Sequence, residues 1–192
     1  MSFHNYFVIP SRAGDRWFSA GLTTSYPNIT ASSGTCLSDL LPCKDSVAPG
    51  CKVFHVPATD SSHAVEVVLE DAVTATFAEL GEQVVVFQYQ GKFHAIDHRC
   101  PHSSYPLSRG TPFDIEDFGV RLSAAIRCPK HDWSFDLFRG NGDRGNYQLK
   151  IWEVQLRPVA GAEIESEGDS KIEGKGSEME IAVWVRRKQR IG

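Results

Sequence analysis

Two short stretches of this sequence limit the folds that the chain can adopt, because each places one cysteine and one histidine beside a proline. The stretch RCPHSSYPL contains Cys100 and His102, two positions apart. The stretch RCPKHDWSFD contains Cys128 and His131, three positions apart. Proline fixes φ and removes a backbone donor, so neither stretch suits the interior of a helix. Thiols and imidazoles are metal ligands, and a fold that uses all four must bring two separate turns to one point.

The rest of the sequence predicts the strands that could present such turns. Short β-branched and aromatic runs with Gly/Pro-rich connections are typical of an all-β sandwich or barrel. Helical periodicity is almost absent, and only residues 71–80 are expected to form a turn or two of helix. Gln90-Gly91 lies between two of the runs and predicts a hairpin. The predicted strands are VFHV (53–56), AVEVVL (64–69), QVVVFQY (83–89), KFHAID (92–97), QLKIWEVQL (148–156) and MEIAVWV (179–185).

The mixed pairing of the four candidate ligands bears on the choice of metal. Zinc accepts two thiolates and two imidazoles, but its finger sites usually pair Cys with Cys and His with His. Here each turn carries one of each kind. That pairing suits a cluster of two unlike irons, in which one iron takes both cysteines and the other takes both histidines, as in a Rieske 2Fe–2S centre. Zinc is the alternative that spacing leaves open.

On these residues the sequence resembles the Rieske iron–sulfur family, whose motifs C-x-H and C-x-x-H stand here as CPH and CPKH. The resemblance runs from about Val53 to Lys188. It implies an all-β, Rieske-type antiparallel sandwich or barrel with a two-loop cluster-binding subdomain, the loops being residues 99–110 and 127–140. The residues WSFD and DLFRG after the second motif resemble the ferredoxin and oxygenase branch of the family.

The resemblance also implies a cofactor and its ligands. A Rieske-type 2Fe–2S cluster would be bound by Cys100 and Cys128 on the buried iron. His102 and His131 would bind the outer iron, with their ring edges near the surface. Four apolar or aromatic residues are expected to shield the cluster or to serve as ordinary core: Tyr105, Leu107, Trp133 and Phe135.

Three departures from the family pattern refine this expectation. Ser103, Ser104 and Tyr105 follow His102, so the extra cysteine of respiratory-type proteins is missing and no loop disulfide is expected. Asp132 stands after the second histidine, where glycine is usual; its carboxylate would lower the potential and makes it the candidate catalytic acid or base. The 25 residues between the two motifs exceed the spacing of compact members. The excess, around residues 111–122, is acidic in its first half and is expected to rim the cluster face.

Composition and charge limit the classes of partner and the cellular compartment that we expect for this chain. The chain has 192 residues and a net charge of −4, which argues against nucleic acid as the main partner. No apolar run approaches the roughly 18 residues of a membrane helix, and the N-terminus does not read as a secretory signal. Five cysteines without such a signal favour a reducing compartment. We therefore expect a cytoplasmic protein with no membrane contact.

The sequence predicts two parts and one leading function. Residues 1–52, rich in Ser, Thr, Pro and Gly, are expected to form an irregular N-terminal extension packed on a Rieske iron–sulfur domain of residues 53–192. The leading hypothesis is a soluble electron carrier that passes single electrons from a reductase to an oxygenase. The first alternative is a stand-alone enzyme, an oxidoreductase or an isomerase or cyclase, with a small-molecule ligand in a pocket at the cluster tip. The second is a redox-sensing binding protein.

Four other signals are assigned to structure. GNGDRG (140–145) matches a dinucleotide-binding pattern, but a strand-like segment follows it, so we interpret it as a turn. Residues 161–178 are acidic and are expected to form a long hairpin loop, with a docking surface as the alternative. His94, Asp97 and His98 have the residue types of an iron site, but successive strand side chains point to opposite faces. Three cysteines are expected to be structural thiols: Cys36, Cys43 and Cys51.

Overall fold

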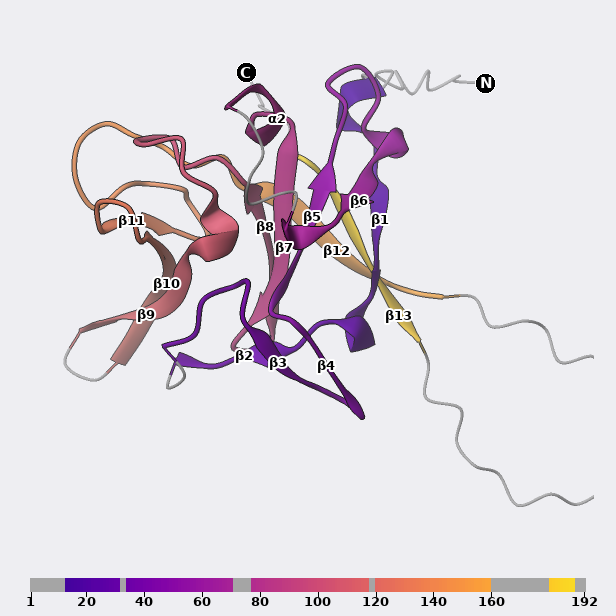
Figure 1. Ribbon diagram of the computed structural model, residues 1–192, viewed down its shortest axis with the longest axis horizontal. Helices are drawn as coiled ribbons and strands as arrows, with labels where there is room; N and C mark the ends of the chain where they lie inside the picture. Colours follow the sequence, from indigo (N-terminus) through magenta and orange to yellow (C-terminus); the bar gives the residue numbers. More distant parts are fainter. Residues whose placement is uncertain (1–12, 32–33, 71–76, 118–119, 160–179, 189–192) are drawn as a thin grey trace, which may run out of the picture.

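The computed structural model describes residues 13–31, 34–70, 77–117, 120–159 and 180–188, and strands dominate them (Figure 1). The expectation of an all-β fold is confirmed. The strands are β1 (Phe18–Leu22), β2 (Asn28–Ile29), β3 (Leu40–Cys43), β4 (Ser46–Pro49), β5 (Cys51–His55), β6 (Val65–Val67), β7 (Gln83–Tyr89), β8 (Lys92–Asp97), β9 (Thr111–Asp117), β10 (Val120–Cys128), β11 (Trp133–Asp136), β12 (Trp152–Pro158) and β13 (Ile181–Arg187). The short helical elements are η1 (Ala13–Asp15), η2 (Thr23–Ser25), η4 (Ser61–His63), α2 (Phe77–Leu80) and η5 (Leu107–Arg109).

Strand β7 lies at the centre of the molecule because its run QVVVFQY is apolar on both faces. Val85 and Phe87 pack into one hydrophobic cluster, and Val84 and Val86 pack into another on the opposite face. All four are fully buried. A continuous apolar run of strand length predicts such two-sided burial. The cluster formed around Val85 and Phe87 also contains Cys100 and Cys128, so the candidate thiols belong to the core.

The strands form three layers (Figure 1). In the middle layer β2, β7, β5 and β6 pair in that order, and β8 also pairs with β7. One side is covered by a sheet of order β1-β13-β12, and the other by a sheet of order β11-β10-β9 that carries the second cysteine–histidine turn. A two-stranded hairpin, β3-β4, completes the described strands.

The hairpin predicted at Gln90-Gly91 is confirmed. Strand β7 pairs antiparallel with β8 from Val84↔Asp97 to Tyr89↔Lys92. Gln90 and Gly91 have φ of 50° and 76°, which are the positive values of the two-residue turn that matches strand twist. Strand β8 therefore runs back along β7 and delivers its last residue directly to the first cysteine–histidine turn.

Residues 1–52 are more regular than expected. The structure places four strands and the start of β5 in the described part of this stretch. Strand β1 pairs with β13, and β2 pairs in parallel with β7. The partners of β1 and β2 lie far along the chain, whereas β3 and β4 pair with each other as a hairpin of four-residue strands without clear apolar alternation. Local composition therefore did not reveal them.

The insertion at residues 111–122 does not lie where the sequence predicted. It forms the hairpin of β9 and β10, in which Thr111 pairs with Arg127 and Asp117 pairs with Val120. The acidic end of this hairpin is eight residues from Cys128, or about 26 Å along the strand. Figure 1 shows the hairpin pointing away from the turns at the other end of β10. The acidic side chains therefore do not rim the candidate site.

Two further expectations concern the remaining segments. In residues 71–80, the described end, α2, is helical. The acidic segment 161–178 lies outside the described residues. In the described part of the chain, no helix combines the length and apolar character needed to cross a membrane.

Acid should destabilise this fold through His94. The side chain is buried and its ring lies 5.5 Å from the Phe87 ring and 5.3 Å from the Phe138 ring. Burial, aided by Lys92, lowers the pKa of His94 to about 4. In the unfolded chain the imidazole of His94 binds a proton near pH 6.5. The neutral, buried His94 therefore contributes its full stabilisation of the fold above that pH, and this stabilisation is lost as pH falls towards 4.

We expect His94 to account for a loss of about 2–3 kcal/mol in unfolding free energy between pH 7 and pH 4.5. Urea titrations at both pH values measure it. His94→Phe retains an aromatic ring without the titrating nitrogen, so it should lose less stability over the same range. Equal losses in both proteins would show that His94 does not contribute.

Candidate metal centre

The two cysteine–histidine turns have the same backbone geometry. The Cys100 carbonyl accepts a hydrogen bond from the Ser104 amide at 2.8 Å, and the Cys128 carbonyl accepts one from the Asp132 amide at 3.0 Å. Each bond spans four residues. Ser104 and Asp132 both have positive φ, 54° and 57°. Each turn thus starts at a buried cysteine, contains its histidine, and ends at a left-handed residue.

The positive φ explains why glycine would be usual where this chain has Asp132. Left-handed backbone costs most residues energy, but a short polar side chain such as aspartate tolerates it. The structure places Asp132 exposed at the surface, where the Arg144 guanidinium donates to its carbonyl oxygen at 3.0 Å. Asp132 therefore has a conformational role in addition to its charge.

The two thiols lie together in the core. Cys100 and Cys128 are 0% and 1% exposed. Interaction with the neighbouring Cys128 thiol lowers the pKa of Cys100, and interaction with Cys100, together with burial, raises the pKa of Cys128. The Ser103 hydroxyl lies 3.7 Å from the Cys128 sulfur, so the first turn also reaches the sulfur of the second. Two turns separated in sequence thus present their sulfurs to one point.

The two imidazoles lie side by side nearer the surface. The ring centroids of His102 and His131 are 5.1 Å apart. His131 is exposed and His102 is partly buried. Nδ1 of His102 is buried and has no hydrogen-bond partner among the described residues. A buried nitrogen without a partner is costly, so this atom is placed as a metal ligand would be.

Aromatic side chains support the His102 ring. The indole of Trp133 stacks on it, with centroids 4.2 Å apart and planes at 15°. Tyr147 meets His102 edge-on at 5.3 Å. The Arg144 guanidinium lies 5.5 Å over the Trp133 ring. The sequence predicted Trp133 as a shielding residue but missed Tyr147 and Arg144, because they come from a third segment.

The other expected shielding residues also lie around the thiols. Leu107 and Phe135 are fully buried in the hydrophobic cluster that contains Cys100 and Cys128, and Tyr105 packs against it. The same contacts thus pack the hydrophobic core and shield the two thiols from water.

The segment GNGDRG forms the turn that brings Tyr147 and Arg144 to the site. Gly140 and Gly145 have φ of 78° and 61°. A Cβ on Gly145 would lie 2.9 Å from the Trp133 ring. Gly145 therefore permits the close approach between this turn and the indole.

A buried polar network under the first turn was not predicted. His98 is fully buried between Gln83 and Ser108, with ring nitrogens 2.7 Å from Gln83 Oε1 and 2.8 Å from Ser108 Oγ. Its carbonyl oxygen accepts a hydrogen bond from the Leu107 amide at 2.7 Å. The two ends of the loop that holds Cys100 are therefore tied together.

His94, Asp97 and His98 have separate partners. His94 packs between two phenylalanine rings, and the Asp97 carboxylate accepts a hydrogen bond from the Trp152 indole at 2.8 Å. These contacts favour the structural interpretation of all three residues.

Two of the three remaining cysteines bond to nearby groups, and the third is buried. Cys36 lies 3.2 Å from the Ser38 hydroxyl, and Cys43 donates to the Thr24 carbonyl at 3.4 Å. Cys51 is buried at the start of β5. All three are free thiols, as are the two candidate ligands.

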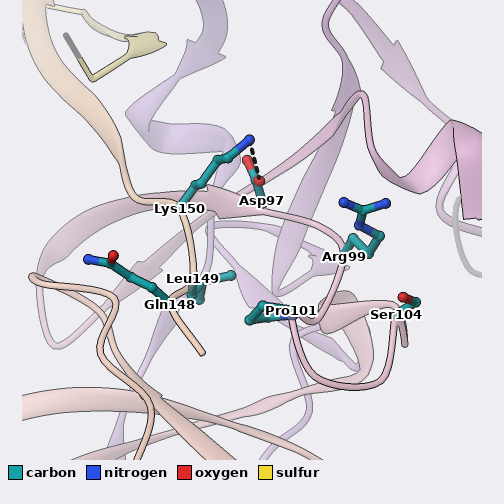
Figure 2. Close-up of a pocket in the computed structure, with 7 residues that line it drawn as sticks. All are labelled: Asp97, Arg99, Pro101, Ser104, Gln148, Leu149 and Lys150. Carbon is teal, nitrogen blue, oxygen red and sulfur yellow. Dashed lines mark ion pairs between the residues drawn. The ribbon is translucent and has the colours of Figure 1, made fainter. Parts of the chain in front are cut away.

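A shallow pocket of about 240 Å³ lies beside the first turn (Figure 2). Pro101 and Ser104 of that turn contribute to its wall, and Arg99 and Lys150 bring two positive charges. Lys150 lies 3.9 Å from Asp97, which also faces the pocket. The complete lining is Asp97, Arg99, Pro101, Ser104, Gln148, Leu149 and Lys150. The candidate acid–base residue Asp132 is not part of it.

Comparison with known proteins decides the family. The family model described as "Rieske [2Fe-2S] domain" matches residues 56–151, half of the chain, and includes both turns. The chain belongs to the Rieske [2Fe-2S] domain family. The resemblance stated from the sequence is confirmed, and the cofactor is a 2Fe–2S cluster, not zinc.

The matching part of this Rieske domain is similar to three curated proteins. It is 45% identical over 60 residues to a Rieske domain-containing protein of Homo sapiens, covering 31% of this chain and 35% of that protein. It is 34% identical over 65 residues to the ferredoxin component of an alkene monooxygenase system of Xanthobacter autotrophicus, covering 33% and 47%. It is 36% identical over 62 residues to a 3-phenylpropionate/cinnamic acid dioxygenase ferredoxin subunit of Photorhabdus laumondii, covering 32% and 51%. The matches thus span about a third to a half of these relatives' lengths.

The candidate residues fit a Rieske cluster. A two-iron cluster needs two protein donors on each iron, and its bridging sulfides supply the other positions. The buried sulfur pair and the outer imidazole pair supply one set each. The unpartnered Nδ1 of His102 is a further sign of fit. Within the described ranges, no three His, Cys, Asp or Glu side chains gather to hold a single ion.

Proposed function

We propose that this Rieske domain is a one-electron carrier that accepts an electron from a reductase and passes it to an oxygenase. One observation carries the proposal: the thiol pair is buried, whereas the adjacent imidazole pair extends to an exposed His131. Because exposure increases from the thiols to His131, one side of a redox centre held here would lie at the surface, where a partner can approach it. The named ferredoxin relatives, which belong to monooxygenase and dioxygenase systems, support the same role.

Within this proposal the four candidate residues divide between the irons. Cys100 and Cys128 would bind the inner iron, and His102 and His131 would bind the outer one. A 2Fe–2S cluster held by these four residues would supply one-electron redox chemistry. The cluster-bearing domain would be residues 53–192, with residues 1–52 as an extension that adds strands to its sheets.

The chain's own residues prepare that site. Leu107 and Phe135 exclude water from the sulfurs because they are fully buried beside them. Trp133 fixes the plane of the His102 ring by stacking on it. Backbone hydrogen bonds from Ser104 and Asp132 to the carbonyl oxygens of Cys100 and Cys128 close both turns. The site is therefore largely organised by the protein, which limits rearrangement when an electron enters or leaves.

A redox titration followed by electron paramagnetic resonance tests the proposal. The reduced protein should give the spectrum of a Rieske cluster, with one electron taken up per chain. The reduced form should then transfer that electron to an oxygenase at a rate above that of the free reductase. A cluster that exchanges no electron with any reductase or oxygenase, yet supports turnover of a small molecule, would contradict the carrier role.

Asp132→Asn should raise the midpoint potential. Asparagine also tolerates positive φ, so the turn should keep its shape while one negative charge beside His131 is removed. Removal of a unit charge from the residue next to His131 should shift the midpoint potential by roughly 20–60 mV. Asp45→Asn, at an exposed position on the β3-β4 turn, is the matched control and should change it little. If Asp132→Asn abolished a turnover activity and left the potential unchanged, Asp132 would be an acid or base instead.

A further inference from the structure

The charge around the two cluster loops is opposite in sign to that of the whole chain. Residues 99–110 and 127–150 contain seven Lys and Arg against three Asp and Glu, a net charge of +4. The whole chain carries −4, so the remainder carries −8. A separation of this size gives the cluster end a positive potential that the net charge conceals.

Two of the three acidic residues in these segments are bound internally. Asp136 accepts hydrogen bonds from the Ser123 hydroxyl at 2.6 Å and from the Phe138 amide at 2.8 Å. Asp143 forms an ion pair with Arg144 at 3.2 Å and accepts a hydrogen bond from the Ser134 amide. Only Asp132 places a carboxylate at the exposed tip of a cluster loop. Most of the acidic charge in the two segments is therefore committed to the protein's own groups.

Five basic residues lie on or beside the cluster loops, and we call them the basic rim: Arg99, Arg109, Lys130, Arg144 and Lys150. Lys130 stands between the two ligand positions of the second motif and is exposed. Arg109 lies 3.5 Å from the Tyr105 hydroxyl, and Arg144 covers Trp133. Arg109 and Arg144 thus contact residues near the candidate ligands, and Lys130 lies between two of those ligands in the sequence.

The other two members of the basic rim line the pocket beside the first turn. Figure 2 shows Arg99 and Lys150 beside this pocket, with Pro101 and Ser104 also contributing to its wall. The Lys150 side chain is 80% exposed, and its contact with Asp97 is 3.9 Å long. With Asp97 included, the pocket lining carries two positive charges and one negative charge. A pocket of about 240 Å³ has room for a carboxylate group from a partner's side chain.

We propose that the basic rim is the docking surface for an acidic face of a redox protein, one of whose carboxylates enters the pocket between Arg99 and Lys150. This inference rests on the proposed carrier function and adds the partner's chemistry to it. Charge complementarity raises the rate of encounter and fixes orientation more than it adds affinity. Lys130 adjoins His131 in the chain and Arg144 lies over Trp133, so a partner attracted to the rim approaches the exposed side of the site. At 0.1 M salt, electrostatic attraction is screened beyond about 10 Å, so charges near the docking surface affect the encounter more than the net charge of the chain does.

Oxidation of the reduced protein by two small reagents tests the sign of this local charge. Hexacyanoferrate(III), of charge −3, and tris(phenanthroline)cobalt(III), of charge +3, each take one electron from the reduced cluster. As potassium chloride rises from low to high concentration, the rate with hexacyanoferrate should fall and the rate with the cobalt complex should rise. A chain that acted through its overall charge of −4 would show the reverse for both reagents, and that result would overturn the proposal.

Single neutralisations locate the effect on the rim. Lys130→Gln and Lys150→Gln should each slow oxidation by hexacyanoferrate by about two- to threefold at low salt. Lys44→Gln removes the same charge at an exposed position on the β3-β4 turn and should leave the rate unchanged. Equal effects at all three positions would show that no local rim exists. A protein that lacks a reducible cluster would react with neither reagent, so failure of the carrier function is recognised separately.

A second readout does not depend on electron transfer. Paramagnetic hexacyanochromate(III) should broaden the amide resonances of residues 139–150 in nuclear magnetic resonance spectra more than those of the β3-β4 hairpin. Diamagnetic hexacyanocobaltate(III), of the same charge, provides the blank. Broadening that spreads evenly over the surface would contradict a localised rim.

Saturable binding of an RNA oligonucleotide to the same residues at physiological salt would overturn the choice of a protein partner.

Discussion

His131→Ala will yield a folded protein with less than about a tenth of the wild-type iron and no Rieske spectrum. The reason is the position of the side chain. His131 is exposed, so its removal leaves no cavity in the core, and the unfolding free energy of the metal-free chain should change by no more than about 0.5 kcal/mol. Iron loss therefore reports ligation and not unfolding.

Iron and sulfide analysis, absorption spectra and urea titration of the metal-free protein measure these effects. His63→Ala is the matched control, because His63 is also exposed but lies on η4, outside both cluster loops. The control should retain full iron. If His131→Ala retained iron with an unchanged spectrum, the assignment of His131 as a ligand would be wrong.

His102→Ala provides a second measurement of the same site. Its Nδ1 has no partner in the described surroundings, so removing the ring should not leave a donor or acceptor unsatisfied. It should, however, remove the stacking partner of Trp133. We expect equal iron loss in both variants but a larger change in the stability of the metal-free chain for His102→Ala.

The sequence predicted the family and the cofactor because the two motifs that indicate them are local. The spacing of Cys100, His102, Cys128 and His131 was sufficient to suggest a two-iron cluster, and the family membership confirms that cofactor. The bounds of β7 and β8 agree with the predicted runs because a two-sided apolar strand and a Gly-containing turn are signals within a few residues.

Features that join distant segments were missed or misplaced. Strands β1 and β2 depend on their partners β13 and β7, which lie far along the chain. The acidic residues 114–117 were expected at the site because they lie between its two motifs, yet a hairpin carries them away from it. Arg144, Tyr147 and Lys150 reach the site only because a glycine turn folds back. Separation in the sequence therefore predicts spatial proximity poorly wherever a strand lies between two residues.

Gly140→Ala should lower the unfolding free energy by about 3–5 kcal/mol, the largest effect that we expect from adding a single methyl group. Gly140 has φ of +78°, and a Cβ there would overlap the Leu149 carbonyl oxygen. The backbone cannot move aside easily, because the Gly140 amide donates to the Asp136 carbonyl and the Leu149 amide donates to the Gly140 carbonyl, both at 2.8 Å. The substitution therefore combines left-handed strain with a clash against fixed backbone.

Gly91→Ala separates these two causes. Gly91 has nearly the same φ, +76°, but a Cβ there would meet nothing within 4 Å. It should cost only the left-handed strain, about 1–2 kcal/mol. Urea titrations of the two metal-free variants give the difference, which is the cost of separating Gly140 from Leu149. Because this contact holds the returning segment against the second cluster loop, Gly140→Ala should also reduce iron content, whereas Gly91→Ala should not. Equal destabilisation by the two substitutions would show that the loop yields without resistance, and that the close approach at Gly140 does not support the site.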